Sequence, residues 1–214
     1  GLAAGVTGSA MAQSKDTIKV GILHSLSGTM AISETVLKDT VLMAIDEINA
    51  KGGILGKKLR FVQYDDAGQP PRGVDNTRRI AQADKCVIIL GGYHSTVAIA
   101  QVEAVHQTGI PYVGTVAANT SVIENGRDPA KNLMFRVSGK DKWVAQFLVE
   151  KAVKRSPSGK IAFLYENTGW GNGALPDIQR AIKAMGKELV ASETFNWNDQ
   201  DMSAQVLRIR DAGA

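Results

Sequence analysis

Four short stretches of the chain combine hydroxyl groups, amides, histidines and glycines in a way that suits the binding of a small polar molecule. Each follows an apolar run and precedes a helical pattern, and they are HSLSGT (24–29), GGYHST (91–96), TVAANT (115–120) and ENTGWGNG (166–173). In open α/β sheets, ligands lie beyond the carboxyl ends of the strands, where helix N-termini present unpaired N–H groups. If the four stretches converge, they surround one binding site.

The GGYHST stretch has the sharpest signal for binding. Ser95 and Thr96 fall at the predicted N-cap of a helix. A hydroxyl group and free N–H groups at the positive end of a helix dipole can hold a carboxylate or a carbonyl oxygen. The simpler alternative is that Ser95 only caps its own helix, and the residues alone leave both interpretations open.

The ENTGWGNGA stretch favours a different function. Gly169–Ala174 satisfies the G-x-G-x-x-G/A pattern, and Glu193 lies roughly twenty residues on, as in dinucleotide-binding turns. Three residues nevertheless separate the predicted strand from the first glycine, and Trp170 would crowd a pyrophosphate. A glycine-rich turn that exposes an aromatic ring to a cleft is the interpretation we favour over an NAD site.

Other chemistry has little support in the sequence. The three histidines, His24, His94 and His106, lack the spacing of a metal site, and we expect His106 to be structural. No nucleophile motif such as G-x-S-x-G is present, and Cys86 lies in the apolar run CVIIL, where we expect it to be buried. The adjacent carboxylates Asp65-Asp66 would point to opposite faces of a strand, so we expect them to cap a joint.

Composition narrows the class of protein further. The chain is 44 % hydrophobic and 21 % charged, which is typical of a globular protein. Its formal net charge is +4, but lysines and arginines are interspersed with acids and form no basic stripe, so nucleic-acid binding is not expected. No apolar run reaches the roughly 18 residues that a membrane span needs.

Strand-like and helix-like runs alternate along the chain, which predicts an α/β fold with parallel sheets. The expected strands are 17–23, 59–64, 86–90, 110–113, 135–137, 160–165 and 189–195. The expected helices include 37–48, 74–83, 95–106, 141–154, 175–185 and 202–211, and 114–131 is expected to be a surface loop. We interpret residues 13–137 as a first lobe and residues 138–214 as a second, incomplete lobe, because it has only two strands.

The first residues fit the end of a secretory signal. Ala10-Met11-Ala12 matches the A-x-A pattern of signal peptidase sites, so we interpret residues 1–12 as a signal-peptide remnant. The mature chain would begin near Gln13 and be exported to the periplasm.

Several long stretches resemble one family, the type I periplasmic binding proteins of ABC importers. The branch is the one for branched-chain amino acids, urea and short amides, which includes the Leu/Ile/Val-binding proteins. The resemblance is carried by KVGILHSLSGTMA (19–31), AIDEINAKGGILGKKLRFVQYDDAG (44–68), GGYHST, GIPYVGTVAANTSV (109–122) and IAFLYENTGWGNG (161–173). It implies two Rossmann-like lobes that close on a ligand by a hinge motion.

The resemblance also implies roles for particular residues. Ser95 matches the serine that grips the ligand in the amino-acid binders, Ala117 and Asn119 match contacts in the following loop, and Trp170 matches the aromatic residue of the second lobe. The aromatic position of the first loop falls near Ser33. With their neighbours, the implied ligand-binding residues are Ser33, Tyr93, His94, Ser95, Thr96, Val116, Ala117, Ala118, Asn119 and Trp170.

The function expected from the resemblance is the binding of a small polar metabolite and its delivery to a membrane permease, without catalysis, metal or cofactor. HSLSGTMAISE resembles the urea and amide binders, whereas GGYHST and TVAANT resemble the leucine binders, so the ligand stays open. We expect a monomer when the chain is complete. The alternatives are a ligand-sensing domain of a receptor or regulator and an NAD-linked oxidoreductase that uses Gly169–Ala174.

Overall fold

The first lobe is built on a five-stranded parallel sheet. A computed structural model describes residues 17–214, and the strand order in this sheet is β2-β1-β3-β4-β5. The strands are β1 (Thr17–His24), β2 (Lys58–Asp65), β3 (Ile89–Gly91), β4 (Tyr112–Gly114) and β5 (Met134–Arg136). The order reverses between β1 and β3, and in folds of this kind the ligand crevice opens at that switch point.

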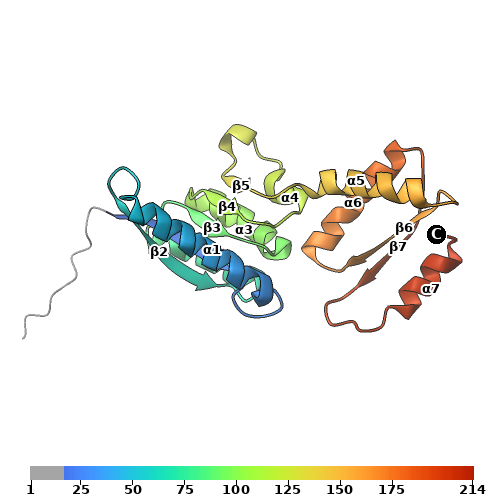
Figure 1. The fold of residues 1–214 in the computed structure, drawn as a ribbon, viewed down its shortest axis with the longest axis horizontal. Helices are drawn as coiled ribbons and strands as arrows, with labels where there is room; N and C mark the ends of the chain where they lie inside the picture. The colour runs from blue at the N-terminus through green and yellow to red at the C-terminus, as the bar shows by residue number, and fades with distance from the viewer. Residues whose placement is uncertain (1–16) are drawn as a thin grey trace, which may run out of the picture.

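Helices cover both faces of this sheet (Figure 1). They are α1 (Ala31–Ala50) on one face and α2 (Pro70–Gln82) with α3 (Ser95–Thr108) on the other. Successive residues of β1 show the division, because Ile22 shares a core cluster with Ile45 of α1, whereas Leu23 shares one with Ile80 of α2. This alternation follows from the two-residue period of a strand.

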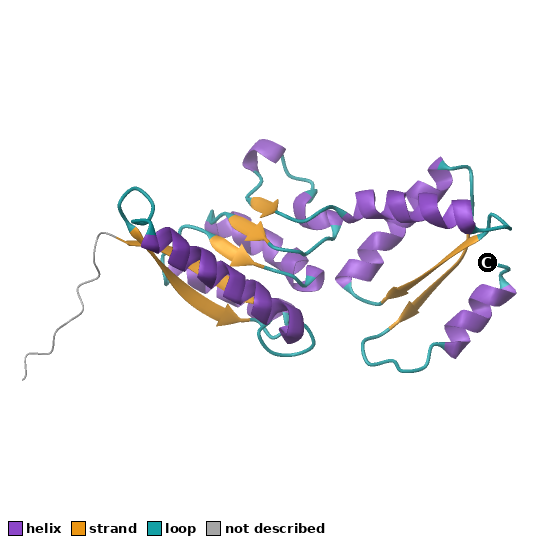
Figure 2. Cartoon of the chain, in the orientation of Figure 1, coloured by secondary structure: helices purple, strands orange, loops and turns teal. Residues whose placement is uncertain are grey.

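The second lobe has a two-stranded parallel sheet of β6 (Ile161–Glu166) and β7 (Leu189–Phe195). Its helices are α5 (Asp141–Arg155), α6 (Gly169–Ala184) and α7 (Ser203–Asp211). Figure 2 shows α5 and α6 on one side of this sheet and α7 on the other. A separate core cluster of Ala145, Val149, Ile178 and Ile182 joins α5 to α6. Residues 137–140 connect β5 to α5 and therefore the two lobes.

The stretch 114–131, expected to be a loop, contains two short helices. They are α4 (Thr120–Ile123), which lies where the lobes meet (Figure 1), and the 3-10 helix η1 (Pro129–Lys131). Each begins after a side chain that accepts a backbone N–H two residues on, Asn119 at 2.7 Å and Asp128 at 3.0 Å. Such local caps stabilise helices too short to show a hydrophobic period.

Several expected elements have different bounds, among them α1 and α2, which begin at Ala31 and Pro70 rather than at residues 37 and 74. Helix α6 begins at Gly169 rather than at residue 175, because Thr168 is its N-cap and accepts the N–H of Gly171 at 3.3 Å. Strand β3 begins at Ile89 rather than at Cys86, which precedes it and is buried as expected.

Two negative findings apply to the part of the chain that the structure describes. Within residues 17–214, no helix combines the length and apolar character of a membrane span. Over the same range, no group of three His, Cys, Asp or Glu residues is placed to hold a metal ion. The predicted signal-peptide remnant at residues 1–12 lies outside the described residues.

Candidate functional site

A cavity of about 360 Å³ lies between the two lobes, at the carboxyl ends of β1, β3, β4 and β6. We call it the interlobe cavity, and residues of both lobes line it. Six lining residues were expected from the sequence, namely Tyr93, His94, Ser95, Val116, Ala118 and Trp170. Four were not, namely Met30, Asp141, Val144 and Glu166. The structure therefore brings three of the four polar stretches together at one site, as the switch-point rule predicts.

Ser95 occupies the first position of α3 and is buried. The N-cap is His94, so the idea that Ser95 caps its own helix is wrong. Its Oγ instead accepts the N–H of Asn119 at 3.3 Å, which fixes the loop after β4 against the start of α3. The hydroxyl hydrogen of Ser95 remains available as a donor, beside the N–H groups that the first turn of a helix leaves unpaired.

His94 is a buried imidazole at the wall of the interlobe cavity. Its side chain is only 9 % exposed, and neither ring nitrogen has a hydrogen-bond partner within residues 17–214. The ring packs on Trp197, with 4.9 Å between the centroids. Burial lowers the pKa of His94, which keeps the ring neutral, with one donor and one acceptor nitrogen.

The second lobe places two carboxylates at the cavity. Glu166 ends β6, and both of its oxygens are occupied, by the hydroxyl of Thr168 at 2.6 Å and by the indole N–H of Trp197 at 3.0 Å. Asp141 begins α5, is 6 % exposed, and accepts the indole N–H of Trp170 at 3.2 Å on Oδ1. Its Oδ2 has no partner among the described residues. Burial raises the pKa of Asp141.

We expected the first polar stretch, HSLSGT, to line the binding site, but none of residues 24–29 lines the interlobe cavity. The hydroxyl groups of Ser25 and Ser27 donate to Asp66 at 2.6 Å and to Asp65 at 2.5 Å, so the acidic pair caps this joint, as predicted. His24 is fully buried and pairs with a carboxylate of α1. Met30 is the residue of the β1–α1 connection that lines the cavity.

Four of the residues implied by the family resemblance lie outside the cavity lining. Ser33 is in the first turn of α1, and Ala117 is fully buried. Thr96 and Asn119 instead hold the lobes together, because Thr96 Oγ1 accepts the N–H of Gly169 at 2.8 Å and the side-chain amide of Asn119 donates to the carbonyl of Gly169.

Two of the three glycines of the GWGNG stretch, Gly169 and Gly173, are explained by this contact. A Cβ on Gly169 would lie 2.9 Å from Thr96 Cα, and a Cβ on Gly173 would lie 1.8 Å from the side-chain nitrogen of Asn119. The space beside these glycines is filled by the first lobe, where a dinucleotide-binding turn would hold a pyrophosphate. The geometry therefore gives Gly169 and Gly173 a packing role at the contact between the lobes, and Gly171, the second glycine of the pattern, packs on the Glu166 carbonyl of its own lobe.

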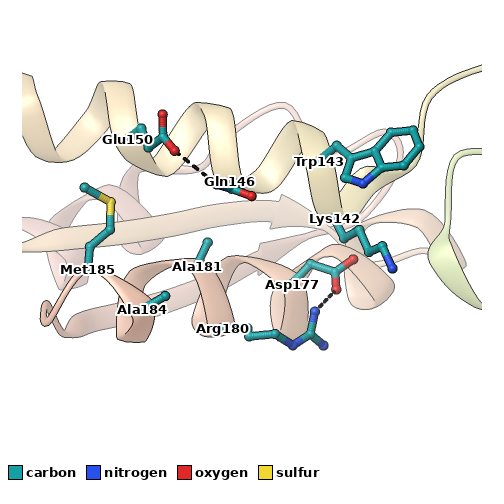
Figure 3. A pocket seen from close by; sticks show the side chains of 9 residues that line it. All are labelled: Lys142, Trp143, Gln146, Glu150, Asp177, Arg180, Ala181, Ala184 and Met185. Carbon is teal, nitrogen blue, oxygen red and sulfur yellow. Dashed lines mark hydrogen bonds and ion pairs between the residues drawn. The ribbon is translucent and has the colours of Figure 1, made fainter.

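A second cavity, of about 470 Å³, lies between α5 and α6 on the outside of the second lobe (Figure 3). We call it the helix groove. Four of its polar side chains pair with one another, since Arg180 pairs with Asp177 at 2.7 Å and the amide of Gln146 donates to Glu150 at 3.2 Å, as the dashed lines show. Lys142 pairs with Glu124 outside the groove at 2.6 Å. The interlobe cavity is the better candidate for ligand binding, because buried polar atoms of His94 and Asp141 lack a partner among residues 17–214.

The residues that sequence reasoning missed carry weak signals. Glu166 directly follows the predicted strand 160–165 and begins the ENTGWGNG stretch, so the rule that ligands lie beyond strand ends was enough to find it. Asp141 starts a helix after the interlobe connection, so its position at the cavity depends on how the lobes meet. Met30 and Val144 are apolar residues with no local feature that marks them.

Comparison with known proteins identifies a family and its relatives. The family model described as periplasmic binding protein matches residues 17–214. Leu/Ile/Val-binding protein homolog 7 of Brucella abortus is 28 % identical over 205 residues, which are 92 % of this chain and 50 % of that relative. The chain thus spans about half the length of the curated relatives it matches.

Solved structures agree with the fold. A type 1 periplasmic binding protein from Bordetella pertussis has a TM-score of 0.82 at 28 % identity, over 92 % of this chain and 54 % of that one. The branched-chain amino acid transporter substrate binding protein LivJ of Streptococcus pneumoniae, in complex with isoleucine, has a TM-score of 0.77 at 24 % identity, over 91 % and 54 %. An R. palustris solute binding protein in complex with 4-hydroxybenzoate has a TM-score of 0.72 at 24 % identity, over 93 % and 52 %.

The matched residues, 17–214, include the doubly wound first lobe, the second α/β lobe and all residues that line the interlobe cavity. This chain belongs to the periplasmic binding protein family, with Leu/Ile/Val-binding protein homologues among its relatives.

Proposed function

We propose that the protein is the solute-binding component of an ABC importer. It is exported to the periplasm, holds a small polar metabolite such as an amino acid or an amide in the interlobe cavity, and delivers it to a membrane permease without chemical change. The observation that carries the proposal is the interlobe cavity itself, whose lining comes from both lobes and includes buried polar groups that have no hydrogen-bond partner in the described part of the chain. A ligand in this place bridges the lobes and favours their closure.

The first lobe is suited to the acidic end of a ligand. Ser95 has a hydroxyl hydrogen to donate, and the first N–H groups of α3 lie at the positive end of its helix dipole. Isoleucine and 4-hydroxybenzoate, which are bound in two of the structural neighbours, both carry a carboxylate. A carboxylate or amide carbonyl at Ser95 is therefore the common element of the ligands we propose.

The rest of the interlobe cavity accommodates a small apolar body. Met30, Val116 and Val144 supply aliphatic surface, and Tyr93 and Trp170 supply aromatic surface. The volume of about 360 Å³ is at the lower end of the range for small-molecule sites, which is roughly 300–1,000 Å³. This size suits a metabolite with the bulk of leucine.

Residues 13–137 and 138–214 act as the two lobes in this proposal, and residues 137–140 act as the joint about which they rotate. The bonds of Gly169 to Thr96 and Asn119 lie at the contact between the lobes and restrict that rotation. The activity of the complete protein, including its permease partner and its monomeric state, is part of the proposal.

A thermal-shift screen tests the proposal. The panel contains leucine, isoleucine, urea, acetamide, 4-hydroxybenzoate and NAD, and it is applied to this chain and to any longer chain of which it is a part. A ligand at 100 times its dissociation constant adds about 2.7 kcal/mol, which is roughly 5–10 °C for a chain of this size. A shift with an amino acid, an amide or an aromatic acid is the expected result. A shift with NAD alone would contradict the proposal.

A further inference from the structure

The two lobes present different chemistry to the interlobe cavity. The first lobe offers the hydroxyl of Ser95 and the N-terminus of α3, which suit an acceptor on the ligand. The second lobe offers the carboxylates Asp141 and Glu166, and no lysine or arginine is among the residues that line the cavity within the described chain. A ligand that fills the cavity therefore has its acceptor end at the first lobe and meets negative charge at the second.

The two carboxylates of the second lobe differ in what they can still bind. Glu166 has both oxygens occupied by internal donors. In Asp141, one oxygen accepts the Trp170 indole N–H, and the other has no partner within residues 17–214, although the residue is only 6 % exposed. A buried carboxylate oxygen without a donor is costly, which marks Asp141 as the group that a ligand donor would satisfy.

Trp170 and the start of α5 fix the position of Asp141. The indole N–H of Trp170 holds Oδ1, and the backbone N–H of Asp141 donates to the carbonyl of Ala118 in the first lobe at 3.2 Å. Arg136, at the end of β5, attracts Asp141 electrostatically and so offsets part of the rise in the Asp141 pKa that burial causes. Within residues 17–214 the two side chains form no ion pair, and Nη1 of Arg136 donates to the carbonyls of Ala117 and Asn119, so the free oxygen of Asp141 still lacks a hydrogen-bond donor.

We propose that Asp141 sets the specificity of the interlobe cavity by accepting a hydrogen bond from an N–H or O–H group of the ligand. This inference rests on the proposed function and adds a requirement to it. The ligand carries an acceptor for Ser95 at one end and a donor for Asp141 on the side of the second lobe. An ammonium group and a hydroxyl group share this chemistry, and matched ligands distinguish them.

The test is calorimetric titration with two pairs of ligands that differ only in the donor. Leucine is compared with 4-methylpentanoate, which lacks the ammonium group, and 4-hydroxybenzoate is compared with benzoate, which lacks the hydroxyl group. In the unmodified protein, the donor-bearing member of one pair binds about 10- to 150-fold more tightly, as expected for a hydrogen bond to a charged group. Equal affinities within both pairs would overturn the inference without any variant.

The variant Asp141→Asn is nearly isosteric and removes the charge. The preference for the donor-bearing ligand disappears in this variant, whereas the affinity for its partner without the donor stays the same. The matched control is Glu150→Gln, which removes the same charge from α5 outside the interlobe cavity and keeps the preference. A preference that survives in Asp141→Asn would overturn the inference while leaving the proposed function standing. If the unmodified protein binds no ligand of the panel, the proposed function fails and the inference fails with it.

Discussion

Replacement of Gly173 by alanine tests the contact that joins the two lobes. A Cβ at this position would lie 1.8 Å from Nδ2 and 2.7 Å from Cγ of Asn119. The Asn119 side chain must move, and it then loses its bond to the Gly169 carbonyl and its cap on the N–H of Ser121. We expect Gly173→Ala to destabilise the protein although alanine is the better helix former.

The magnitude follows from the bonds that are lost. A helix cap contributes about 1 kcal/mol, a hydrogen bond contributes about 1 kcal/mol, and the overpacked side chain costs about 1–3 kcal/mol. The higher helix propensity of alanine offsets about 1 kcal/mol of this destabilisation. The net loss of about 2–4 kcal/mol corresponds to a fall in melting temperature of roughly 4–16 °C, at about 2–4 °C per kcal/mol for a chain of this length.

The assay is thermal unfolding followed by circular dichroism, with Gly139→Ala as the control. Gly139 lies in the connection between the lobes and has no left-handed φ, and no atom of residues 17–214 lies within 4 Å of the position that a Cβ would take. Its replacement should leave the melting temperature equal or slightly higher, because alanine reduces the entropy of the unfolded chain. A Gly173→Ala protein that melts at or above the temperature of the unmodified protein would refute the reasoning about this contact.

Three further predictions concern single residues. Ser95→Ala should weaken ligand binding by about 1–3 kcal/mol in calorimetry because a buried ligand group loses its partner, whereas Ser33→Ala, outside the cavity lining, should leave the dissociation constant unchanged. Hydrogen bonds from two lysines lower the pKa of Glu124 to about 2, so its stabilisation is complete above its unfolded pKa of about 4.3 and is lost as the pH falls toward 2. Glu124→Gln should flatten this part of the curve of melting temperature against pH, and an unchanged curve would contradict the assignment. Burial raises the pKa of Cys86 to about 11, so iodoacetamide at pH 8 should modify it only in denaturant, and rapid labelling of the folded protein would show that the thiol is accessible.

The fold was largely predictable from the sequence because its signals are local. The buried run TIKVGIL, the helical spacing of apolar residues after it and the repetition of this unit predict parallel strands with crossover helices. The start of α6 was not predictable in this way. The glycines and Pro176 have low helix propensity. The cap by Thr168 and the contacts of Gly169 with the other lobe nevertheless stabilise the helix from residue 169 onward.

The candidate site was predictable only in part. The turn around Ser95 lies at the cavity because a strand end and a helix start define its position. The HSLSGT stretch also has serines at a joint between a strand and a helix. Their hydroxyl groups, however, donate to Asp65 at the end of β2 and to Asp66, the residue after it. Asp141 reaches the cavity only through the contact between the lobes, which has no signature in a single sequence.

The most direct test of ligand binding in the interlobe cavity uses two of the three tryptophans as reporters. Trp170 lines the cavity, whereas Trp143 lines the helix groove. The chain is labelled with nitrogen-15 in its indole groups, and spectra are recorded during titration with the ligand that gives the largest thermal shift. We expect the Trp170 indole resonance to move with ligand concentration while that of Trp143 stays in place. Movement of Trp143 with an unchanged Trp170 resonance would contradict it.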